Sequence, residues 1–197
     1  MVELEHRPVE PPELTAYRLA HPEGAVAGFD SLEFGPVKSV VKRALNEDQG
    51  GLCVYCERRL SPGDGQVDHI RPKGGSQAEP HLCFTYRNFA HSCIDHRTCG
   101  QKKKDGRLPI EPGPGCNAEW TLSIETGHVV PRDGLTRRRR HDVEQTQGML
   151  GLNASTELVK DRLSWVKNTA EVLQLAPELV DEFLDTAPFR YLLRTVY

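Results

Sequence analysis

Apolar residues recur at helical spacing in two parts of the chain. The first run begins after Gly35-Pro36 and ends at Gly50-Gly51, and proline suits the first turn of a helix while glycine suits its end. A second run lies in the last sixty residues, at spacings of four and three, which predicts a helix with one apolar stripe. The two stripes are Val37, Val40, Val41, Ala44 and Leu45, and Val159, Leu163, Val166, Ala170 and Leu173.

Shorter apolar stretches between turn signals predict strands. The pieces around Val54 and at 67–70 flank a turn-prone segment at 61–65, so we expect them to pair as a hairpin. A second hairpin is predicted for 120–124 and 128–130. A short helix that carries a run of lysines is expected from near Thr98, and further helices are expected after Pro177 and Pro188.

These patterns divide the chain into four regions. Residues 1–35 are rich in proline and glycine and show little periodicity, which predicts an extended arm that lies on other surfaces. The region 36–108 contains most of the candidate chemistry. An accessory lobe of hairpin and loops is expected for 109–140, and a helical region for 141–197.

The composition is that of a soluble globular protein with a modest core. The chain has 197 residues, of which 38% are hydrophobic, and no stretch approaches the roughly 18 apolar residues of a membrane span. The first residues lack the apolar run of a secretory signal. We therefore expect a cytoplasmic protein without a membrane contact.

The charge of the chain is informative only locally. A formal net charge of −3 gives no global sign of nucleic-acid binding. Basic residues nevertheless cluster at Lys102, Lys103 and Lys104, where they are expected to contact phosphates. The run 137–140 fits a second phosphate contact and a solvated loop equally well.

Four of the six cysteines fall into two pairs, Cys53/Cys56 and Cys93/Cys99. Disulfides are rare in a reducing cytosol, and two cysteine pairs can complete a tetrahedral Zn²⁺ site. The alternatives are that these cysteines are buried apolar residues, or that His91 or His96 supplies a nitrogen ligand. Cys83 and Cys116 each stand without a close partner and are expected to be buried or incidental, with Cys83 as the reserve ligand in place of Cys93.

Asp68 and His69 lie between the two cysteine pairs. Hydrolysis of a phosphodiester needs an activated water, a cation and groups that hold the phosphate. A histidine suits the role of base, and an aspartate suits a hard cation such as Mg²⁺. An Asp-His pair alone is usually structural, but here Arg71 and Lys73 follow it and could contact phosphates.

The segments 48–58, 67–73 and 86–103 resemble the HNH endonucleases, and more specifically the PtuB-like nuclease subunits of Septu anti-phage systems and the related retron-associated effectors. Weaker similarities occur at 7–14, 108–112 and 150–153. The resemblance implies an α+β fold with a ββα-metal (HNH) core and a zinc knuckle, embedded in N- and C-terminal helices. It also implies DNA as substrate and an ABC/SMC-type, PtuA-like ATPase partner. This chain has no Walker motif, so any dependence on nucleotide must come from a partner.

The resemblance also assigns roles to residues. His69 matches the general base, Asp68 a ligand of a catalytic Mg²⁺ or Mn²⁺, and Asn88 the residue that orients the histidine and its loop. The four paired cysteines match the zinc knuckle. The third HNH position is Gly100, which has no side chain, so its role is vacant or passes to Gln101.

This departure leads to one expectation and leaves two alternatives open. With Asp68 as the single anionic ligand, we expect the catalytic metal site to be complete only when DNA phosphate is bound. The alternatives are a catalytically inactive, zinc-stabilised nucleic-acid-binding module, and a structural adaptor in which zinc merely stabilises a small core.

Overall fold

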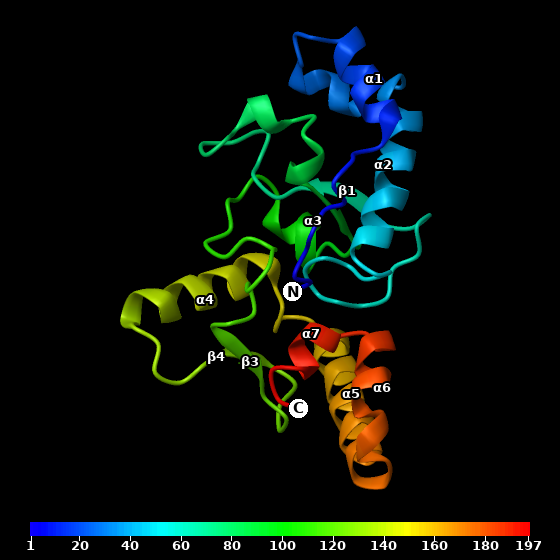
Figure 1. Cartoon of the computed structure of the whole chain (residues 1–197). Helices are drawn as coiled ribbons and strands as arrows, with labels where there is room; N and C mark the ends of the chain where they lie inside the picture. Colours follow the sequence, from blue (N-terminus) through cyan, green and yellow to red (C-terminus); the bar gives the residue numbers. More distant parts are fainter.

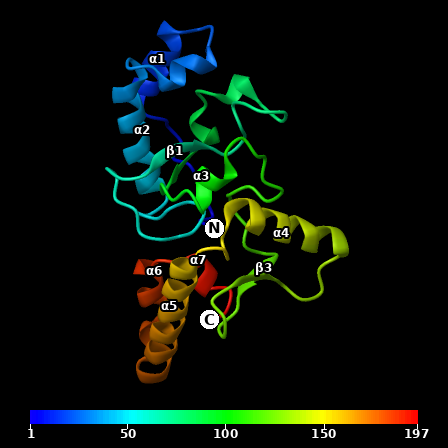
Figure 2. The same ribbon diagram turned by 180° about the vertical axis from the view of Figure 1, so that it is seen from behind.

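Seven α-helices surround two small antiparallel sheets in the computed structural model, which describes residues 1–197 (Figure 1). In both views α1, α2 and β1 lie at one end of the molecule and α5 and α6 at the other (Figure 2). None of the helices combines the length and apolar character that a membrane crossing requires. The helices are α1 (Pro12–Ala20), α2 (Phe34–Asp48), α3 (Cys99–Lys103), α4 (Arg137–Leu150), α5 (Thr156–Leu175), α6 (Val180–Thr186) and α7 (Arg190–Leu193).

The first sheet differs from the predicted hairpin. Strand β1 (Gln66–His69) pairs with β2 (Phe89–Ser92), so that Asp68 lies opposite Ala90. The predicted partner around Val54 was wrong, because the chain there forms a tight turn between Cys53 and Cys56. Val54 lies on the other side of β2 and donates one backbone hydrogen bond to the His91 carbonyl, at 3.0 Å.

Helix α2 supports this sheet. Val41, Ala44 and Leu45 on its apolar face are buried, and the helix packs against β1 and β2 as its hydrophobic spacing predicts. Its polar face carries two lysines, Lys38 and Lys42. Strand β2 follows β1 along the chain, and α3 follows β2. Helix α3 begins at Cys99, next to Thr98, as expected.

The N-terminal region is only partly the extended arm that was predicted. Residues 12–20 form α1, which packs on α2 through Leu14 and Tyr17. The prediction missed this helix because its two buried residues are too few to produce a clear helical pattern. The first residues are extended, and Val2 and Leu4 are buried in the core.

The second half of the chain contains a hairpin and four helices. The predicted hairpin is confirmed by β3 (Trp120–Leu122) and β4 (Val129–Pro131). Helix α5 is also present, but its buried side differs from the predicted stripe: Val166 is buried, whereas Ala170 and Leu173 are exposed. Arg162 is fully buried on that side and donates to the Gly127 carbonyl at 3.3 Å, so a charged residue interrupts the hydrophobic pattern.

Candidate active site and metal centre

The four paired cysteines converge as the sequence predicts. The sulfur atoms of Cys53, Cys56, Cys93 and Cys99 all lie within 4.8 Å of one another. Two of the Sγ–Sγ distances are 3.8 and 3.9 Å. A tetrahedral ion with metal–sulfur bonds of about 2.3 Å has ligand edges of about 3.8 Å, so the cluster can hold a metal ion such as Zn²⁺.

The alternative ligands lie outside this cluster. Cys83 and Cys116 are buried elsewhere. The ring nitrogens of His91 face the Asp64 carbonyl oxygen, at 2.7 Å, and the Asn46 amide, at 3.2 Å. His96 is exposed at the surface.

The backbone around the cluster is shaped for ligation. The Cys93 N–H donates to Cys53 Sγ at 3.3 Å, which favours a thiolate at that sulfur. Glu57 and Cys99 both adopt positive φ angles, 62° and 57°. Such conformations cost a non-glycine residue about 1–3 kcal/mol and persist only where the surroundings hold them. A bound ion would hold both turns.

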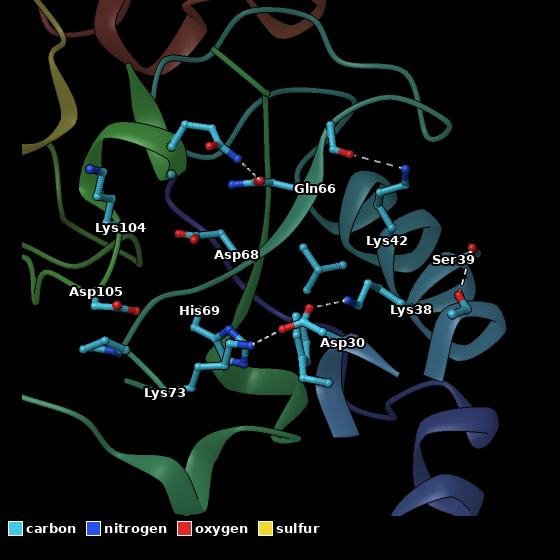
Figure 3. A pocket seen from close by; sticks show the side chains of 17 residues that line it. Asp30, Lys38, Ser39, Lys42, Gln66, Asp68, His69, Lys73, Lys104 and Asp105 are labelled. Atoms are coloured by element: carbon cyan, nitrogen blue, oxygen red, sulfur yellow. Dashed lines mark hydrogen bonds and ion pairs between the residues drawn. The ribbon is translucent and has the colours of Figure 1, made fainter. Parts of the chain in front are cut away.

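A cleft of about 460 Å³ lies between α2, β1 and α3. Figure 3 shows Asp68 and His69 between lysines of α2 on one side and Lys104 on the other. Asp68 and His69 are successive residues of a strand and so would ordinarily face opposite sides of the sheet. Both nevertheless line this cleft, because His69 ends β1.

His69 is held at one ring nitrogen. Its Nε2 lies 2.9 Å from the carbonyl oxygen of Cys83, and since a carbonyl can only accept, Nε2 carries the proton and Nδ1 keeps its lone pair. The ring is 6% exposed and lies between Phe29 and Phe89, with centroid distances of 4.5 and 5.2 Å. Burial lowers the pKa of His69 to about 4. The imidazole is therefore a neutral base at physiological pH.

The carboxylate of Asp68 has a hydrogen-bond donor and an ion-pair partner inside the protein. Its Oδ2 accepts a hydrogen bond of 2.5 Å from the Tyr55 hydroxyl and lies 3.4 Å from Lys103 Nζ. Burial raises the pKa of Asp68, while the charge of Lys103 and the hydrogen bond from Tyr55 oppose that shift. Lys103 is 4% exposed, so the expected phosphate contact of this residue is not possible at the surface.

Gly100 lies directly beside Asp68. A β-carbon at position 100 would be 3.0 Å from Asp68 Cγ and 2.8 Å from Gln66 Nε2. Gln101 lines the cleft and donates its amide to Gln66 Oε1. The oxygen donors directly around Gly100 are thus the Asp68 carboxylate and the side-chain amides of Gln66 and Gln101. This set suits Mg²⁺, which keeps several waters and commonly binds one or two carboxylates together with substrate phosphate.

Asn88 holds the loop that joins β1 to β2. Its Oδ1 accepts from the Arg71 N–H at 2.8 Å, and its Nδ2 donates to the Arg71 carbonyl at 3.0 Å and to the Leu82 carbonyl at 3.3 Å. It makes no direct hydrogen bond with His69. The two residues contact adjacent carbonyl groups of the loop, Asn88 that of Leu82 and His69 that of Cys83.

The candidate phosphate-binding residues divide into two groups. Lys73 and Lys104 line the cleft. Arg71 points elsewhere and pairs with Glu111 at 3.2 Å, and the side chain of Lys102 lies against Gly151.

Sequence reasoning missed two lysines of the cleft, Lys38 and Lys42 on α2. Their spacing of four places them on one face of the helix. That signal was present, but a polar helix face is ordinarily solvated, and only the packing of α2 on β1 brings this face to the cleft.

The sequence is similar to two known proteins. No family model matches the sequence. The chain is 39% identical, over 98% of both chains, to the proposed HNH endonuclease of retron Vc95 from Vibrio cholerae serotype O1 biovar El Tor. It is 28% identical to the Septu protein PtuB of Bacillus thuringiensis, over 74% of this chain and 54% of PtuB. The chain therefore belongs to the HNH endonuclease family, close to the retron and Septu proteins.

Proposed function

We propose that the chain is a metal-dependent HNH endonuclease that hydrolyses phosphodiester bonds of DNA, with β1, β2 and α3 as its ββα-metal core. The observation that carries this proposal is the state of His69. It is a neutral imidazole whose Nε2 is fixed by Cys83, and it lines a basic cleft beside Asp68. A group of this kind can take a proton from water at neutral pH.

The other residues of the cleft have complementary roles. Asp68 Oδ1 would hold Mg²⁺ or Mn²⁺, together with a Gln101 amide oxygen, and the ion would supply charge stabilisation at the phosphate. His69 Nδ1 accepts the proton of the attacking water. Lys73 and Lys104, with Lys38 and Lys42 from α2, hold the phosphates of the strand without reading its sequence.

The cysteine cluster would hold a structural Zn²⁺. All four ligand positions are filled by sulfur, as in structural rather than catalytic zinc sites. The cluster joins the turn before β1 to the end of β2 and the start of α3. It therefore fixes α3, with Gly100 and Gln101, against Asp68.

The cleavage assay should compare wild type with His69→Ala on plasmid DNA in Mg²⁺ and in Mn²⁺, with and without any ATPase encoded beside it. We expect nicking or linearisation by wild type and its loss in the variant. His141→Ala, which removes an exposed histidine on α4, is the matched control and should cleave normally. Cleavage by a correctly folded His69→Ala protein would contradict the proposal.

A second candidate function is a zinc-stabilised DNA-binding module without catalytic activity. Two observations favour it: Gly100 supplies no ligand, and Lys103 already neutralises Asp68. The same experiment separates the two candidates, because a binding module would retard DNA in a gel and cleave it in neither metal, even with the partner.

We also propose that the chain acts in anti-phage defence together with an ABC/SMC-type ATPase, as its resemblance to the Septu nuclease subunit implies. An apolar groove between α5 and α6 supports a protein contact, since Leu175 and Leu179 are 74% and 49% exposed there and Glu171 and Glu182 border it. This charge suits a basic, apolar-faced segment. Leu175→Asp with Leu179→Asp should abolish co-purification with the ATPase without lowering the melting temperature, and unchanged co-purification would exclude the groove.

A further inference from the structure

The ammonium group of Lys103 makes two hydrogen bonds and one ion pair inside the protein. Its Nζ donates to the His69 carbonyl at 2.9 Å and to the Lys104 carbonyl at 3.2 Å, and it lies 3.4 Å from Asp68 Oδ2. The side chain is 1% exposed. A buried ammonium with this set of acceptors is a fixed positive charge rather than a mobile surface group.

The two oxygens of Asp68 have different surroundings as a result. Oδ2 is occupied by the Tyr55 hydroxyl and faces the Lys103 ammonium. Oδ1 is the oxygen that a β-carbon at Gly100 would approach, at 3.1 Å. The carboxylate is therefore held with one oxygen toward α3 and the cleft, and it can bind an ion through that oxygen alone.

We propose that Lys103 is a positioning residue that orients Asp68 and, through its charge, keeps the affinity of the free protein for a divalent cation low. This inference rests on the proposed function, because it concerns the same metal ion. A cation beside Oδ1 experiences the repulsion of the ammonium on the other side of the carboxylate. The negative charge of a bound phosphate offsets that repulsion, so the ion is held firmly only when the substrate is present.

The other acidic residues of the cleft, Asp30 and Asp105, are not paired with Lys103. Asp30 is already paired with Lys73 at 2.8 Å and with Lys38 at 3.3 Å. Asp105 also lines the cleft, beside Gly74 and Gly75, and forms no ion pair with Lys103. Gly100 provides no donor. The ion pair with Asp68 is therefore the one that Lys103 makes.

The test is a titration of the zinc-loaded full chain with Mn²⁺ alone, followed by calorimetry and by the EPR signal of free Mn²⁺. Wild type should bind weakly, and Lys103→Met, which keeps the length and removes the charge, should bind at least roughly tenfold more tightly. Lys103→Arg is the matched control and should bind as wild type does. Adding Asp68→Asn to Lys103→Met should abolish the gain.

Several outcomes would overturn the inference. One is Lys103→Met binding Mn²⁺ no more tightly than wild type, although its zinc content and circular dichroism are unchanged. Another is a gain that survives Asp68→Asn. If Lys103→Met does not fold, the Mn²⁺ affinity of the wild-type protein without DNA is the test. A dissociation constant below about 10 µM would contradict a metal site that needs substrate to complete it.

The failure of this inference is distinguishable from the failure of the proposed function, because the titration requires no cleavage. If Lys103→Met binds Mn²⁺ more tightly but wild type cleaves no DNA, the role of Lys103 is supported and the proposed endonuclease activity is contradicted. If wild type cleaves DNA but Lys103→Met binds Mn²⁺ no more tightly, the role of Lys103 is contradicted and the proposed endonuclease activity stands.

Discussion

His69 Nε2 lies 2.9 Å from the carbonyl oxygen of Cys83, and this contact fixes both the tautomer and the direction of the imidazole. Cys83 belongs to the loop between β1 and β2, which Asn88 holds at Leu82 and at Arg71. The histidine and the asparagine, which do not touch, are thus connected through the loop. This connection is a physical route for the orienting role that the resemblance to HNH endonucleases implies for Asn88.

Asn88→Ala should lower both stability and cleavage. The substitution leaves the partly buried Arg71 N–H without its acceptor and frees the loop, which should reduce the free energy of unfolding by about 1–3 kcal/mol. Chemical denaturation measures the first effect and single-turnover cleavage the second. Arg87→Ala, at an exposed neighbouring position, should change neither. A normal cleavage rate in Asn88→Ala would show that the loop does not position His69.

The buried His69 should make stability depend on pH. Its pKa is about 4 in the folded protein and about 6.5 in an unfolded chain. The unfolded chain therefore binds more protons between these values, and stability that is fully present above pH 6.5 is lost as pH falls toward 4. From pH 7.5 to 5 the contribution of this group should fall by roughly 2 kcal/mol.

Urea unfolding of wild type and His69→Ala at both pH values isolates this contribution. The loss of stability on acidification should be smaller in the variant by that amount, since all other titrating groups are shared. Equal losses in the two proteins would mean that the imidazole is solvated or already charged at neutral pH.

The cysteine pairs, α2, α3 and the hairpin at 120–131 could be predicted from the sequence because each has a local signal. The pairing of β1 could not, since β2 is buried along its whole length and lacks the alternation of a half-buried strand. Lys103 was misread for a related reason: a lysine run indicates a surface, and only the tertiary structure shows that its middle member is buried against Asp68.

Removal of one cysteine ligand should release the metal and destabilise the site. In Cys99→Ser the start of α3 loses its attachment to the turn at 53–56, and the free energy of unfolding should fall by at least about 3 kcal/mol. Zinc content by elemental analysis should fall from one ion per chain to none. Cys83→Ala, outside the cluster, should keep its zinc. Retention of zinc by Cys99→Ser would assign the fourth ligand to another residue.

The lysines of the cleft should determine how strongly DNA binding depends on salt. Each phosphate contact adds about 0.9 to the slope of log K against log salt for duplex DNA. Lys38, Lys42 and Lys104 all line the cleft, so their triple alanine variant should flatten the slope by about two to three. Binding is measured with His69→Ala as background, which prevents cleavage during the titration.

The matched control for these lysines lies on α5. Lys160 and Lys167 are exposed there and do not line the cleft, so their double alanine variant removes surface charge without removing a phosphate contact. Its slope should equal that of the parent. If this double variant flattens the slope as much as the triple variant does, DNA is attracted by the overall charge of the surface and the cleft is not its path.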